Sequence, residues 1–97
     1  MIYEFDYVMK GVLRLLEKLK TAEKVVGTRT TLKAIENGKC EHVFIAEDAD
    51  VFITRRVTEL CRKAGCEYTR VETMKMLGEA CGVQVPTACA AIKNHAE

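Results

Sequence analysis

The stretch HVFIAED, residues 42–48, decides the fold, because it contains the clearest buried strand in the chain. Val43, Phe44 and Ile45 form an unbroken apolar run, which is typical of a strand covered on both faces. The next segment, residues 53–64, has apolar residues at helical spacing on one face: Val57, Leu60, Cys61 and Ala64. A buried strand followed by an amphipathic helix predicts an α/β fold.

Outward from this pair, helices and strands alternate along the chain. Three further helices are predicted, over residues 9–22, 28–37 and 74–81. Three further strands are predicted: KVVG (24–27), CEYTRV (66–71) and ACAAIK (88–93). Thr28 and Thr73 are predicted to cap helices, and glycines are predicted to end them: Gly38, Gly65 and Gly82. The alternation predicts a three-layer α/β/α sandwich with a four-stranded mixed sheet.

Length and composition fit one domain, residues 1–97, in which residues 1–8 form an extension dispensable for folding. The chain is 48% hydrophobic, which favours a packed core over disorder. Its 15 Lys and Arg nearly balance 14 Asp and Glu, so any basic surface is a local patch. No apolar run approaches the ~20 residues that span a bilayer, and a monomer is expected.

The cysteines indicate a cytoplasmic protein rather than a disulfide scaffold. Their number is odd, no C-x-x-C occurs, and no signal peptide is visible. We expect them to be buried as small hydrophobes, not to bind a metal: Cys40, Cys61, Cys66, Cys81 and Cys89. His42 and His95 are expected at the surface, and no Ser/His/Asp or Cys/His arrangement is present. The prediction is a non-enzymatic protein without a cofactor.

VVGTRTTLK, residues 25–33, carries the strongest functional pattern. Gly27 permits close backbone approach, and the following helix start attracts anions through its free N–H groups. Arg29 and Lys33 are four residues apart and therefore share one helical face. Phosphates and guanine edges both suit this surface. The alternative is that Thr28 only caps the helix and the cations are solvated.

Two loops carry weaker patterns. Glu47, Asp48 and Asp50 follow the buried strand and either bind Mg²⁺ or a phosphoryl group, or cap the next helix. Val83 and Val85 lie in a loop made extended by Pro86, and either form an exposed apolar tip for an unstacked nucleotide or fold back onto the core.

Several motifs together resemble the kink-turn RNA-binding ribosomal-protein family of the L7Ae/L30e type. They are VVGTRTTLKAIENGK, VFIAEDAD, LCRKAGCEY, VETMKMLGEACGV and ACAAI, which span about residues 10–93. The sequence looks most similar to the small bacterial members. The resemblance implies a compact α/β/α domain that binds an RNA bend containing tandem sheared G·A pairs.

The family pattern Gly-x-Asn-Glu-x-x-Lys matches at Gly27 and Lys33, whereas Arg29 and Thr30 replace Asn and Glu. This departure removes a carboxylate and adds a cation, so base discrimination would depend more on Arg29. The resemblance assigns further RNA contacts to an acid, a lysine and an apolar loop: Asp50, Lys75, Val83, Gln84 and Val85. Together with Gly27, Thr28, Arg29, Thr30 and Lys33, they make up the predicted RNA site.

The sequence therefore favours a non-enzymatic protein that binds kink-turn RNA and stabilises its bent form, with ribosomal RNA among the candidate targets. One alternative is a small α/β signalling or metal-dependent protein that uses Glu47, Asp48 and Asp50. The other is a protein-interaction module that docks through the apolar loop.

Overall fold

The computed structural model describes residues 14–94, so the predicted extension at residues 1–8 lies outside the described range. A helical segment at residues 14–21 comes first. Strands and helices then alternate: β1 (Lys24–Val26), α2 (Thr28–Glu36), β2 (Cys40–Ala46), α3 (Val51–Ala64), β3 (Glu67–Val71), α4 (Met74–Cys81) and β4 (Cys89–Lys93). This is the predicted order. Within residues 14–94, no helix combines the length and apolar character that crossing a membrane requires.

The sheet has the strand order β1-β4-β2-β3 and is mixed, as predicted. Strand β2 runs parallel to β3, whereas β4 lies between β1 and β2 and is antiparallel to both. The strands β1, β2 and β3 consequently end on the same side of the sheet, where β4 begins. This side is called the carboxyl end of the sheet below.

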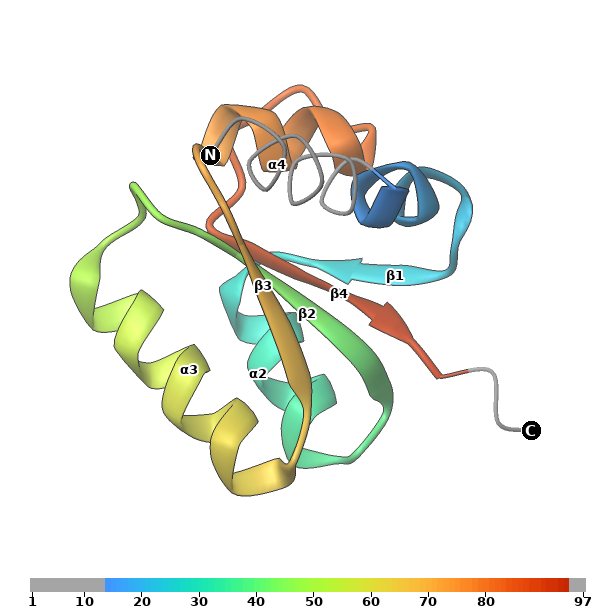
Figure 1. The fold of residues 1–97 in the computed structure, drawn as a ribbon. Coiled ribbons are helices and arrows are strands. Elements are labelled where there is room, and N and C mark those ends of the chain that lie inside the picture. The colour runs from blue at the N-terminus through green and yellow to red at the C-terminus, as the bar shows by residue number, and fades with distance from the viewer. Residues whose placement is uncertain (1–13, 95–97) are drawn as a thin grey trace, which may run out of the picture.

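Helices cover both faces of the sheet, which confirms the three-layer prediction (Figure 1). Phe44 and Ala46 pack with buried residues of the first helical segment and α4. Their neighbours Val43 and Ile45 face the other way, towards α2 and α3. Residues 43–46 of β2 are therefore all apolar, because successive side chains enter two different cores.

Capping residues and glycines determine where the helices begin and end. Thr73 accepts a hydrogen bond from Met76 N at the start of α4, and Gly82 adopts a left-handed conformation at its end, as predicted. Gly65 ends α3 in the same way. Helix α3 begins at Val51, earlier than the predicted residue 53, because Asp50 caps it by accepting from Phe52 N.

Candidate nucleic-acid interface

Three backbone hydrogen bonds bring distant segments together at the carboxyl end of the sheet. Gly27 N donates to Cys89 O at 2.9 Å, and Ala46 N donates to Ala88 O at 2.8 Å. Glu47 N donates to Val71 O at 2.8 Å. The start of α2, the loop after β2, the turn after β3 and the loop before β4 therefore surround one end of the molecule, on the left in Figure 1.

Helix α2 begins without a side-chain cap, so the prediction that Thr28 caps it is wrong. Gly27 occupies the N-cap position, with φ 103°, and no side chain accepts a hydrogen bond there. Thr28 is already helical, and its hydroxyl accepts from Cys89 Sγ at 3.8 Å. The Thr30 hydroxyl instead donates to Val26 O at 2.7 Å.

The missing cap leaves polar groups free at this helix start. No partner in residues 14–94 accepts from the backbone N–H groups of Thr28, Arg29 and Thr30. Arg29 and Thr30 are exposed, and Thr28 is partly exposed. Unpaired N–H groups at the positive end of a helix dipole, beside an arginine, form a favourable environment for a phosphate.

Arg29 and Lys33 line one hollow between α2 and α3, with a volume of about 600 Å³. The prediction that they share a face is confirmed. Arg56 of α3 lines the same hollow and adds a third cation, which sequence reasoning missed. Nothing local marks Arg56, because its neighbours on α2 are set by the packing of both helices on one face of the sheet.

The loop before β4 borders a second hollow of about 460 Å³, lined by α4 and loop residues: Lys75, Glu79, Val83, Gln84, Val85 and Pro86. Val85 is 64% exposed, whereas Val83 packs against the core. Val85 thus matches the predicted exposed apolar tip, and Val83 matches the alternative in which the loop folds back onto the core. Thr87 N donates to Met74 O at 3.0 Å, which ties the loop to α4.

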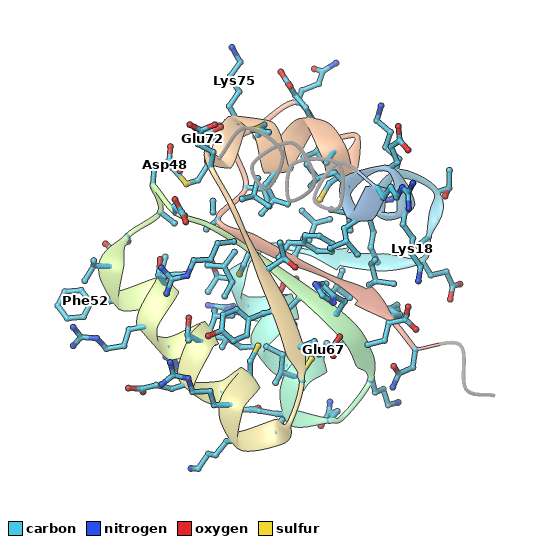
Figure 2. All side chains as sticks on the ribbon, viewed as in Figure 1. Lys18, Asp48, Phe52, Glu67, Glu72 and Lys75 are labelled. Atoms are coloured by element: carbon cyan, nitrogen blue, oxygen red, sulfur yellow. The ribbon has the colours of Figure 1, made fainter. Side chains whose placement is uncertain are left out.

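Two of the three acidic side chains in the loop after β2 accept hydrogen bonds at helix starts. Asp50 caps α3, and Asp48 accepts from Met74 N at 2.8 Å at the start of α4. Figure 2 shows Asp48, Glu72 and Lys75 close together there. Across the described residues, no group of three His, Cys, Asp or Glu side chains is placed to hold a metal ion. These contacts support the capping alternative over the metal or phosphoryl site.

The predicted RNA residues thus do not lie in one cavity. Arg29 and Lys33 lie on the α2–α3 side of the sheet, and Lys75 and Val85 lie on the α4 side. The two hollows share no lining residue, and the Gly27–Cys89 hydrogen bond links the elements that carry them. A ligand that contacts both must pass over the carboxyl end of the sheet.

Predictions for two other residue types need correction. His42 is half-buried rather than at the surface, because its Nε2 lies 2.7 Å from Thr69 Oγ1 across two adjacent strands. His95 lies outside the described residues.

Three cysteines are buried as small hydrophobes, as predicted: Cys61, Cys81 and Cys89. Cys40 and Cys66 are only partly buried, and their sulfur atoms lie 3.6 Å apart. Burial, together with the neighbouring Cys66, raises the pKa of the Cys40 thiol to about 12.

Comparison with known proteins identifies the family of the chain. The model of the ribosomal protein L7Ae/L30e/S12e/Gadd45 family matches residues 9–97. RNA-binding protein GK0100 of Geobacillus kaustophilus is 44% identical over 77 residues, covering 78% of this chain and 94% of the relative. RNA-binding protein YbxF of Geobacillus stearothermophilus is 43% identical over 77 residues, with the same shares of both chains.

Two solved structures have a similar fold. The 15.5kD RNA binding protein of Giardia lamblia superposes with a TM-score of 0.79 at 36% identity, over 87% of this chain and 74% of that one. A Bacillus halodurans protein of unknown function superposes with a TM-score of 0.75 at 23% identity, over 82% and 84% of the two chains, and supports the fold alone. The family resemblance is confirmed, and it agrees with a non-enzymatic role. The chain belongs to the ribosomal protein L7Ae/L30e/S12e/Gadd45 family.

Proposed function

We propose that this protein binds RNA containing a kink-turn and stabilises the bent form. The uncapped start of α2 and Arg29 contact phosphates and guanine edges at the bend, and Lys33 contacts the backbone from the next helical turn. The exposed Val85 covers a nucleotide turned out of its stack. Since the protein binds the bent RNA better than the extended RNA, it shifts the population towards the bend.

One observation carries this proposal: the Gly27–Cys89 hydrogen bond holds the start of α2 beside the start of β4, which the loop of Val85 precedes, although α2 and β4 are far apart in sequence. The relatives that are named RNA-binding proteins cover most of this chain at 43–44% identity, which supports RNA as the ligand. Ribosomal RNA is one candidate source of the kink-turn. The structural roles of Asp48 and Asp50 favour this function over the metal-dependent alternative.

A binding experiment with two RNAs tests the proposal. One RNA carries tandem sheared G·A pairs, and the other has the same length with those pairs replaced, and both are titrated at two salt concentrations. We expect tighter binding to the first RNA, with an affinity that falls as salt rises. Arg29→Ala and Lys33→Ala should each weaken this binding, whereas Lys39→Ala, at the opposite end of the sheet, should not. Equal affinity for both RNAs would contradict kink-turn recognition.

A further inference from the structure

A third hollow, outside the predicted RNA site, lies between α3 and the edge strand β3. Its volume is about 420 Å³, and Arg55, Arg62 and Arg70 line it. Glu59 is the one acidic residue in its lining. We call this hollow the α3–β3 groove. None of these four residues belongs to the predicted RNA site.

Backbone geometry explains why the arginines converge. Arg55 and Arg62 are two helical turns apart and thus lie on one face of α3. Arg70 pairs in register with Ile45, whose side chain packs in the core beneath α2 and α3. Neighbours in register point to the same face of a sheet, so Arg70 projects from β3 towards α3.

No ion pair between described side chains neutralises the arginines of the groove. Among the described side chains, the ion pairs are Lys18–Glu41 and His42–Glu67, and neither involves a groove residue. Arg55, Arg62 and Arg70 are exposed. Three guanidinium groups against one carboxylate leave a net positive groove, and guanidinium groups pair well with phosphate oxygens.

The groove is continuous with the carboxyl end of the sheet. Val51, which also lines it, is the first residue of α3 and directly follows the loop at that end. Arg70 is one residue from the end of β3. From Arg55 to Arg62 the helix rises ~10 Å. A DNA duplex carries about one phosphate per 1.7 Å of its axis, which sets the scale for an RNA duplex. A duplex that leaves the interface along α3 thus places several phosphates within reach.

We propose that the α3–β3 groove binds the phosphate backbone of an RNA stem that extends from the bend. This proposal rests on the proposed function and adds a second, sequence-independent contact to it. The lining offers no aromatic side chain for base stacking, which favours a backbone ligand over unpaired bases. The groove therefore determines how affinity depends on stem length, and not which bend is recognised.

The test uses two kink-turn RNAs that share the same bend, one with a minimal stem and one with that stem extended by a helical turn. The double variant Arg62→Gln/Arg70→Gln removes two groove charges. Lys39→Gln/Lys93→Gln removes two exposed charges from the other end of the sheet and serves as the control. We expect the wild type and the control to bind the extended RNA more tightly than the minimal one. The groove variant should lose that gain, keep its affinity for the minimal RNA, and show a salt slope lower by about 2 on the extended RNA.

The outcomes separate this inference from the proposed function. If the minimal RNA binds and stem extension adds nothing, or if the groove variant retains the full gain, the inference is overturned while the proposed function stands. If neither RNA binds, both proposals fail. Urea unfolding of each variant checks the fold, and Arg55→Gln provides a second groove variant with the same expected direction.

Discussion

Gly78 determines how closely the loop of Val85 packs on α4. The residue is buried within the helix, and a Cβ at this position would collide with the carbonyl oxygen of Val85. Since the obstacle is backbone, it cannot rotate away. Gly27 differs, because its φ of 103° rather than any crowding disfavours a side chain.

Replacing Gly78 by Ala therefore sets two effects against each other. Helix propensity alone would stabilise α4 by about 1 kcal/mol, whereas overpacking costs about 1–3 kcal/mol. We expect Gly78→Ala to lower the free energy of unfolding, measured with urea, and to weaken kink-turn binding by displacing the loop. Glu79→Ala, at an exposed neighbour, is the control for stability. A more stable Gly78→Ala protein would contradict this packing.

His42 makes stability depend on pH. Burial lowers its pKa from the ordinary 6.5, although the charge of Glu67 opposes this shift. The folded protein thus binds a proton less readily than the unfolded chain, so the contribution of neutral His42 is complete above about pH 6.5 and is lost as pH falls from there. Urea unfolding from about pH 7.5 to pH 5 should show a steeper loss of stability for the wild type than for His42→Gln. Parallel curves would show that His42 is not the titrating group.

At the scale of elements, the start of α4 is capped by side chains and the start of α2 is not. The first therefore contributes to stability, and the second is available to bind a ligand. Thr73 caps α4, and Asp48 accepts a hydrogen bond from the next residue, so this helix start is satisfied internally. Helix α2 has no side-chain cap. An anionic ligand therefore gains more at the start of α2 than at the start of α4.

Alanine substitutions at the two helix starts test this difference. Thr73→Ala should lower the free energy of unfolding by about 1 kcal/mol, because a side-chain cap is lost, and Thr73→Ser should restore most of it. Thr28→Ala should cost less, since its hydroxyl caps nothing. Urea unfolding of the three variants gives the comparison. A larger cost for Thr28→Ala than for Thr73→Ala would contradict the assigned caps.

At the scale of the whole molecule, the sheet separates an interface end from an opposite end. The interface end holds the start of α2 and residues 87–88, which bond to Met74 and Ala46, and the opposite end holds the turns at Gly38 and Gly65. The net charge of +1 means that attraction for RNA comes from local patches and not from the protein as a whole.

Backbone amide chemical shifts recorded during titration with kink-turn RNA should distinguish the interface end from the opposite end. We expect the largest changes at residues 27–33 and 82–88, with further changes along α3 and at Arg70 when the RNA stem is long. Amides at residues 37–39 and 65–66 should change least and serve as an internal control. Changes centred on those turns would place the RNA at the wrong end of the molecule.

The sequence predicted those features that depend on neighbouring residues. The bounds of α4 follow from Thr73 and Gly82, and the apolar run of β2 predicted a strand covered on both faces. The prediction that Thr28 caps α2 was wrong, because Thr28 and Gly27 are both acceptable cap residues and only the observed backbone distinguishes them. A sequence can thus predict the bounds of a helix correctly and the hydrogen bonds of its first turn incorrectly.

By itself the sequence determined the alternation of helices and strands, the glycines that end α3 and α4, and the family, because periodicity, caps and motifs are properties of short segments. Tertiary structure alone decided which segments meet. The contact of Thr28 with Cys89 depends on β4 lying between β1 and β2. The addition of Arg56 to the hollow of Arg29, and of Arg70 to the groove on α3, depends on helix packing and strand register. Strand order and register depend on the combined packing of both cores, so no local pattern encodes them.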